Sequence, residues 1–293
     1  MSAKTPESQA FLQARSRFAS LVGGRKTQPP LAETALVVAC EEYADLNPRP
    51  YLARLHAFGS VVAERLRAEW QGVPLHQVPA GERLEAVRSY LFGELGFRGN
   101  ESEYYDPRNS FLNEVIDRRL GIPITLSLVF LEVASAAGLR MAGVGYPGRF
   151  LVRTRGTSPS IYLDPFAGGA EIPVDTLRSR LAEDGYSFGD IVGVLRGASP
   201  RDVIRRLLSN LKSIYLKNGD FARAVGIAER LLLLNPEAAF ELRDLGLAWG
   251  KLGHYGKGID AYEEYLRADP QAEDRADVER DLADLRYWLS RLN

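Results

Sequence analysis

Seven pairs of residues in the last third of the chain match at a constant separation of 34 positions. Most pairs join residues of one class, such as Gly219 with Gly253 and Pro236 with Pro270. Because all the pairs fall in one register, two consecutive repeats are indicated, at about residues 203–236 and 237–270. The full set is Leu211 with Leu245, Tyr215 with Trp249, Gly219 with Gly253, Phe221 with Tyr255, Ala224 with Gly258, Ala228 with Tyr262, and Pro236 with Pro270.

A period of 34 residues is that of the tetratricopeptide repeat, in which each unit is a pair of helices. The sequence therefore predicts an all-α repeat domain over residues 200–293. Stacked repeats need a cap at an open end, and the amphipathic segment 275–292 is expected to supply one. Its packing face is expected to carry Leu282, Leu285, Trp288 and Leu289.

The concave face of these repeats is predicted to be basic. Lys217, Arg243 and Lys251 fall at repeat positions that face inward, where they would attract an acidic peptide or a C-terminal carboxylate. The alternative is that two repeats serve only to pack against the preceding domain. The residues predicted to bind a partner are Lys217, Phe240, Arg243, Leu247 and Lys251.

The first 96 residues are predicted to form a helical subdomain. Apolar residues recur at helical spacing in segments 11–22, 31–43, 51–70 and 81–97, and glycines and prolines separate these segments. The single cysteine, Cys40, lies inside the second segment and is expected to be a buried structural thiol.

Residues 97–190 are predicted to form an α+β core. The segment 124–137 carries one charge, Glu132, and is apolar on every other side, which is typical of a fully buried helix. Two strands are expected, at about 142–154 and 160–164, and a helix feeding an antiparallel sheet gives an α+β fold.

The ends of the smaller elements of this core follow from capping residues. Asn109 or Ser110 is expected to cap a helix that runs to about Arg119 and is ended by Gly121. A short helix near 174–182 and a loop to about Pro200 are expected after the strands.

The segment 97–169 resembles the transglutaminase-like domain of the SirB-type family of bacterial proteins, which commonly carries tetratricopeptide repeats behind it. The resemblance implies a papain-like core. It does not extend to the first 96 residues, which match by position and helical character only. The pieces that carry the resemblance are residues 99–100, 104–113, 118–127, 143–153 and 163–166.

The resemblance implies a catalytic triad, which this chain keeps only in part. In transglutaminase-like enzymes a cysteine opens the buried helix, a histidine lies on the next strand and an aspartate on the strand after. Here the helix opens with Pro123, Ile124 and Thr125, and Arg149 occupies the place that often holds histidine. Arginine has a pKa of about 12 or more and cannot act as a base at neutral pH. Only Asp164 matches the triad.

We therefore expect a degenerate site with no catalytic residue, in which Arg149 pairs with the carboxylate of Asp164. The polar residues that precede the buried helix have two interpretations: they form a turn and a helix cap, or they line a groove together with this ion pair. The residues assigned to the degenerate site are Asp106, Asn109, Asn113, Pro123, Thr125, Arg149 and Asp164.

These observations favour a non-catalytic scaffold or regulator, in other words a pseudoenzyme, that binds a protein or peptide and modulates a signalling protein or enzyme. One alternative is a hydrolase or acyltransferase for amide or ester bonds whose nucleophile is Thr125 or Ser127, although a hydroxyl without a base is a poor nucleophile. Another is a structural or assembly module with no regulated partner.

Composition bears on the remaining classes of function. The net charge is −1, so no overall basic field favours nucleic acid. The three histidines are scattered and no nucleotide-binding motif is present, so neither a metal nor another cofactor is expected. The most apolar window, 120–131, is shorter than the roughly 20 residues that cross a bilayer. With no signal-peptide pattern at the start, a cytoplasmic protein is expected.

Overall fold

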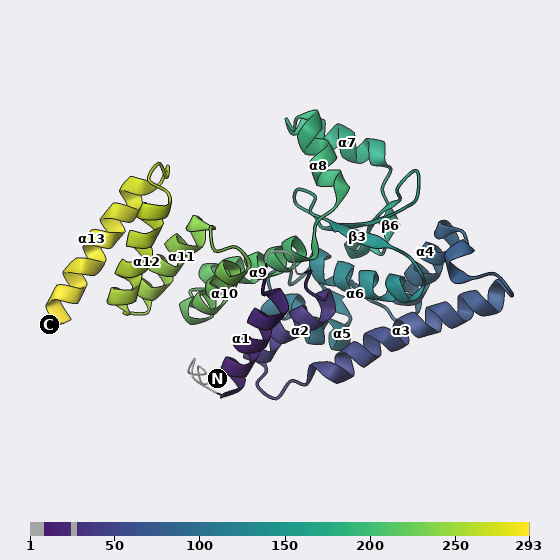
Figure 1. Cartoon of the computed structure of the whole chain (residues 1–293), viewed down its shortest axis with the longest axis horizontal. Helices are drawn as coiled ribbons and strands as arrows, with labels where there is room; N and C mark the ends of the chain where they lie inside the picture. Colours follow the sequence, from purple (N-terminus) through teal and green to yellow (C-terminus); the bar gives the residue numbers. More distant parts are fainter. Residues whose placement is uncertain (1–8, 25–27, 293) are drawn as a thin grey trace. The chain divides into compact units, whose positions relative to one another are not determined.

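The computed structural model describes residues 9–24 and 28–292, and it has the predicted α+β class (Figure 1). Two compact units are present, and the main division of the chain falls after Ile204, inside helix α9. The N-terminal helices and the α+β core belong to the same compact unit. The boundary predicted between residues 96 and 97, inside this unit, stays a prediction.

The elements of the first unit follow one another from purple to green in Figure 1. The helices are α1 (Gln9–Val22), α2 (Leu31–Glu42), α3 (Pro48–Glu69), α4 (Ala80–Arg88), α5 (Leu112–Arg118), α6 (Pro123–Ala136), α7 (Val174–Glu183) and α8 (Phe188–Arg196). The short 3-10 and π turns are η1 (Leu75–Gln77), η2 (Ser89–Glu94), η3 (Pro107–Ser110) and η4 (Pro165–Ala167). The strands are β1 (Arg98–Gly99), β2 (Leu120–Gly121), β3 (Met141–Val144), β4 (Leu151–Thr154), β5 (Tyr162–Asp164) and β6 (Ala170–Glu171).

The main sheet is antiparallel, with its four strands in the order β3-β4-β5-β6. Val144 of β3 pairs with Leu151 of β4, so the segment predicted as one strand at 142–154 is a hairpin. That prediction was wrong because Pro147 and Gly148 form a turn that interrupts the strand, and Gly148 has a φ of 67°.

Helix α6 is the centre of the first unit, as its nearly uncharged sequence predicted. Leu128, Phe130 and Val133 are buried, and the helix contacts α3 on one side and strands β3 and β4 on the other. A Cβ on Gly59 of α3 would lie 2.3 Å from the Cβ of Ala136. Only a glycine allows the two helices to approach this closely.

The other face of the sheet is covered by α7 and α8, which lie above it in Figure 1. Leu151 and Tyr162 of the sheet pack in one buried cluster with Leu177 of α7 and Leu195 of α8. Helix α8 lies where a loop was predicted, and its two glycines lower its helix propensity. Its start is nevertheless fixed by a reciprocal capping box between Ser187 and Asp190.

The helix caps before α6 also differ from the prediction. Asp106, rather than Asn109 or Ser110, caps the short η3 turn, and α5 starts after Phe111 without a side-chain cap. Arg119, in the left-handed conformation with a φ of 59°, ends α5. Gly121 does not end a helix but lies in β2, paired with Gly99 of β1, and its carbonyl accepts a hydrogen bond from the amide of Asn100.

The second unit has the predicted paired helices of tetratricopeptide repeats followed by a last helix. Gly219 and Gly253 both adopt a positive φ, of 71° and 77°, in the turns between paired helices. Leu282 of the last helix is buried, but Trp288 is 51% exposed, which contradicts its predicted place on the packing face. The helices are α9 (Pro200–Lys217), α10 (Phe221–Leu234), α11 (Ala239–Lys251), α12 (Tyr255–Ala268) and α13 (Arg275–Leu292).

Two glycines bring α11 and α12 together in this unit. A Cβ on Gly246 would lie 2.3 Å from the ring of Tyr262. One on Gly258 would lie 3.1 Å from the carbonyl oxygen of Gly246. Glycine at 258, where the first repeat has alanine, is therefore explained by the closeness of the two helices.

A buried ionic cluster joins α9 to α11. The ammonium group of Lys212 lies 2.6 Å from a carboxylate oxygen of Glu241 and 2.5 Å from one of Asp244. Lys212 and Glu241 are almost completely excluded from solvent. Burial raises the pKa of Glu241, and the hydrogen bond from Lys212 opposes that shift.

Candidate functional site

The predicted ion pair between Arg149 and Asp164 is present in the structure. Nη1 of Arg149, in the turn between β3 and β4, lies 3.1 Å from Oδ2 of Asp164 at the end of β5. The arginine side chain is 48% exposed, whereas that of the aspartate is 6% exposed. The arginine therefore covers a nearly buried carboxylate.

The second oxygen of Asp164 has a structural task. Its Oδ1 accepts hydrogen bonds from the backbone amides of Phe166, at 3.0 Å, and Ala167, at 3.3 Å, and so caps the η4 turn. Both oxygens of the carboxylate thus have donors. An aspartate used in this way positions the chain after β5 as much as it positions Arg149.

Thr125, at the start of α6, is occupied by contacts with its own neighbourhood. Its hydroxyl donates to the carbonyl of Asn109, at 2.8 Å, and accepts from the amide of Ile122, at 3.1 Å. The side chain is fully buried. Pro123, the first residue of the helix, is buried as well. These are the contacts of a helix cap, and they favour the structural interpretation of this residue.

Asn109 connects the loop before η3 to the rest of the site. Its Nδ2 donates to the carbonyls of Glu103 and Tyr104, and its Oδ1 accepts from Asn100 and Arg118. The residue is fully buried. An asparagine with four such contacts holds a loop in place.

Asp106 and Asn113 complete the polar cluster. Burial acts to raise the pKa of Asp106, but hydrogen bonds from the side chain and amide of Arg108 outweigh burial and hold it below its usual value. Asn113 is buried, and its Oδ1 has no hydrogen-bond partner within the described part of the chain.

The residues of the degenerate site are therefore brought into two groups. The ion pair of Arg149 and Asp164 forms one, and the turn-and-cap network of Asn109 and Thr125 with its neighbours forms the other. Ser127 is buried, and its Oγ donates to the carbonyl of Phe150 at 3.3 Å. Neither candidate hydroxyl is exposed to a substrate from solution in this arrangement.

The repeat residues predicted to bind a partner do not form a set of available cations. Arg243 pairs with Asp244, at 3.0 Å, and with Asp274, at 2.7 Å. Leu247 packs against the buried cluster of α11, α12 and α13. Phe240 and the side chains of Lys217 and Lys251 are exposed. The repeat pattern predicted the helices, but it did not predict the two acidic residues that form ion pairs with Arg243.

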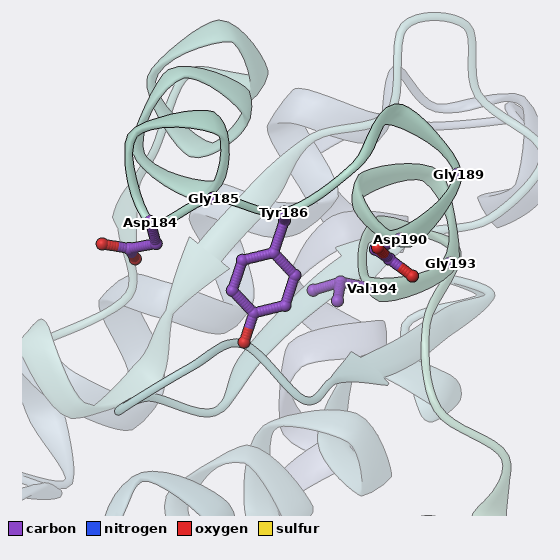
Figure 2. Close-up of a pocket in the computed structure, with 7 residues that line it drawn as sticks. All are labelled: Asp184, Gly185, Tyr186, Gly189, Asp190, Gly193 and Val194. Carbon is purple, nitrogen blue, oxygen red and sulfur yellow. The ribbon is translucent and has the colours of Figure 1, made fainter.

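Two hollows lie on the α7–α8 pair, and neither is lined by residues of the degenerate site. Asp184, Tyr186 and Asp190 line the first one, and Figure 2 shows the Tyr186 ring between the two carboxylates. Asp190 is already bonded to the hydroxyl and amide of Ser187. The second hollow lies over the sheet and is lined by arginines and apolar residues.

This second hollow was not predicted because α8, which forms one of its walls, lies where a loop was expected. The signal was present: Ser187 followed three residues later by Asp190, just before Ile191, is a helix start. Across the described ranges, no group of histidine, cysteine, aspartate and glutamate has the arrangement of a metal site. Within the same ranges, no helix combines the length and apolar character needed to cross a membrane.

Comparison with known proteins gives two family matches. Residues 49–209 match the model of a transglutaminase-like superfamily, and residues 211–283 match a tetratricopeptide repeat. The first match begins within α3, so it includes part of the helical region that carries no motif of its own.

Several relatives cover most of the chain. A UPF0162 protein of Xylella fastidiosa is 37% identical over 260 residues, which are 87% of this chain and 90% of the relative. A UPF0162 protein of Vibrio cholerae is 29% identical over 234 residues, 78% of this chain and 84% of the relative. F-box only protein 21 of Mus musculus is 29% identical over 200 residues, which are 31% of that longer protein.

Proposed function

The chain belongs to the transglutaminase-like family that includes the UPF0162 proteins, and we propose that it is a non-catalytic scaffold or regulator that binds another protein. The chain combines a transglutaminase-like domain with tetratricopeptide repeats, a module suited to protein interaction.

One observation carries the proposal: Arg149 pairs with Asp164 at the place where the resemblance puts a general base. A guanidinium stays protonated at neutral pH and cannot accept a proton from a nucleophile. Because Asp164 is committed to Arg149 and to the cap of η4, it does not orient an imidazole. The ion pair therefore leaves this position without a base that could activate a nucleophile.

The surroundings of α6 support the same proposal. A hydroxyl nucleophile needs a base within hydrogen-bond reach and access to substrate. Thr125 instead bonds to backbone groups on both sides, and Ser127 bonds to a backbone carbonyl. Cys40, the single cysteine, lies in α2, with its sulfur 3.7 Å from the carbonyl of Leu46.

The first test is affinity capture from extract of the native cells, followed by titration of the purified partner. Wild type is compared with Arg149→Ala, with Arg243→Ala/Lys251→Ala, and with Arg67→Ala as a control on the exposed side of α3. A saturable partner lost in one of the first two variants and kept in the control is expected. It would also show which surface binds.

The rival class is tested on the same proteins. A hydrolase or acyltransferase would turn over ester or amide substrates, and Thr125→Ala or Asp164→Asn would abolish turnover while the fold stays intact. That outcome would refute the non-catalytic proposal. A chain with neither turnover nor a saturable partner would instead favour a purely structural module.

A further inference from the structure

The hollow between α7 and α8, with Arg153 and Tyr162 of the sheet at its floor, is here called the α7–α8 hollow. Its volume is about 530 Å³, within the range of about 300–1,000 Å³ that is usual for binding sites. Tyr162, Ile191 and Leu195 are buried in its lining. The base of the hollow is therefore largely apolar.

One edge of α8 leaves large apolar side chains in solvent at this hollow. Phe188 is 82% exposed and Val192 is also exposed, one turn further along. Ile191 and Leu195, which follow on the same face of the helix, are buried in the cluster with the sheet. Exposed Phe188 and Val192 therefore form an apolar patch beside the hollow, and such patches mark interaction surfaces.

All the charges that line the α7–α8 hollow are positive. Arg153, Arg178 and Arg196 line it, and no aspartate or glutamate does so within the described residues. The chain as a whole has a net charge of −1, so this gathering of cations is local.

These arginines have few acidic partners of their own. Nη1 of Arg153 donates only to neutral oxygens, the hydroxyl of Tyr162 at 3.4 Å and the carbonyl of Leu195 at 3.3 Å. Arg178 pairs with Asp175 on its own helix, but both side chains are well exposed and such a pair is weak. Arg196 has no salt bridge within the part of the chain that the structure describes. The charge is available to a ligand.

We propose that the α7–α8 hollow binds a segment of a partner protein in which a bulky apolar side chain is flanked by aspartate or glutamate. The inference rests on the proposed function, because it gives that protein partner a surface and a chemistry. The apolar side chain would lie against Phe188 and the base of the hollow, and the carboxylates would meet the arginines.

The distribution of charge favours a peptide over a small fatty acid. The three arginines come from β4, α7 and α8, so the hollow offers three separate guanidinium groups to carboxylates. A fatty acid offers a single carboxylate, whereas a peptide segment can offer one on each side of its apolar anchor.

The test is selection of random twelve-residue peptides displayed on phage against the purified full-length protein. Enriched peptides with acidic residues beside an aromatic or large aliphatic residue are expected. A synthetic peptide of the enriched pattern is then titrated by fluorescence polarisation. The double change Arg178→Glu/Arg196→Glu, and separately Phe188→Ser, should weaken its binding by about ten-fold or more.

Matched controls distinguish binding at the hollow from non-specific electrostatic or hydrophobic binding elsewhere on the protein. Arg67→Glu reverses an exposed arginine on α3, and Leu12→Ser removes an exposed leucine on α1. Both should leave the affinity unchanged. Replacing the acidic residues of the peptide with lysine should abolish binding. Because Phe188 and Arg196 are exposed, circular dichroism should show these variants to be folded.

Three outcomes would overturn the inference: no enrichment, enriched peptides without acidic residues, or binding that the hollow variants do not change. Decanoate serves as a competitor, and saturation of the hollow by decanoate without any peptide binding would assign it to a small amphiphile. Peptides or captured partners that bind elsewhere would leave the proposed function standing and remove only the hollow from it.

Discussion

Replacing Asp164 with alanine should destabilise the first unit because two separate contacts are lost. The cap of η4 loses an oxygen that accepts from the amides of Phe166 and Ala167, and losing a cap costs about 0.5–2 kcal/mol. The ion pair with Arg149 adds only about 0.2–1 kcal/mol, since that side chain is about half exposed. The sum is about 1–3 kcal/mol in the free energy of unfolding.

Two further variants separate these contributions. Asp164→Asn keeps an oxygen for the cap and loses the charge, so it should cost only the ion-pair share, about 0.2–1 kcal/mol. Arg149→Ala should cost a similar amount for the same reason. Asp164→Ala should therefore lower the free energy of unfolding the most. Asp164→Asn and Arg149→Ala should lower it less and by nearly equal amounts.

Urea unfolding gives the free energies, and native-state hydrogen exchange at the amides of Phe166 and Ala167 shows where protection is lost. Both amides should exchange faster in Asp164→Ala and keep their protection in Asp164→Asn and Arg149→Ala. If Asp164→Asn were as damaging as Asp164→Ala, the charge and not the cap would dominate, and the assignment of Asp164 as a capping residue would fail.

Three other perturbations test the packing and the charges of the fold. Gly246→Ala would place a methyl group 2.3 Å from the Tyr262 ring and should cost about 1–3 kcal/mol, whereas Gly256→Ala, with nothing within 4 Å, should be neutral or slightly stabilising in the same urea measurement. Burial raises the folded-state pKa of Glu132, against an opposing hydrogen bond from a backbone amide, so stability is lost as the pH rises through that pKa. The stability of Glu132→Gln relative to wild type should therefore increase from about pH 4 to pH 8, and no increase would contradict the shift. Lys212→Met should cost about 3–5 kcal/mol because it leaves the buried carboxylate of Glu241 without its cation, and a loss below about 1 kcal/mol would mean that water reaches this carboxylate.

Local and periodic signals made much of the fold predictable. The repeat register placed Gly219 and Gly253 in equivalent turns because a 34-residue period fixes both helix lengths and turn positions. The nearly uncharged sequence of α6 predicted the central helix. The pair of Arg149 and Asp164 was predicted from their places in the resembling domain, and it is present.

Features that depend on distant partners were not predictable in this way. From the sequence alone, Lys212 would be expected on the surface. In the structure its ammonium group pairs with Glu241 and Asp244, which lie about 30 positions later in the chain. Arg243 was expected to face a ligand, but Asp274 occupies it. In both cases the helix that carries the basic residue was predicted. The acidic residue that pairs with it from another part of the chain was not predicted.

Helix α8 shows a different limit, because two local signals disagreed. Gly189 and Gly193 lower helix propensity, while the capping box at Ser187 and the packing of Ile191 and Leu195 on the sheet favour the helix. Packing decided the outcome. The α7–α8 hollow was missed with the helix that forms its wall.

The ionic joints of the second unit discourage growth of the array by gene duplication. A copy of residues 237–270 inserted after Pro270 would present its own Glu241 and Asp244 to Gly246, which stands 34 positions after Lys212 and carries no ammonium group. Arg243 would then face a copied phenylalanine instead of Asp274. Each added copy would therefore bury acidic groups at the contact between repeats without a cation to neutralise them. Duplication alone does not readily extend the array beyond two repeats.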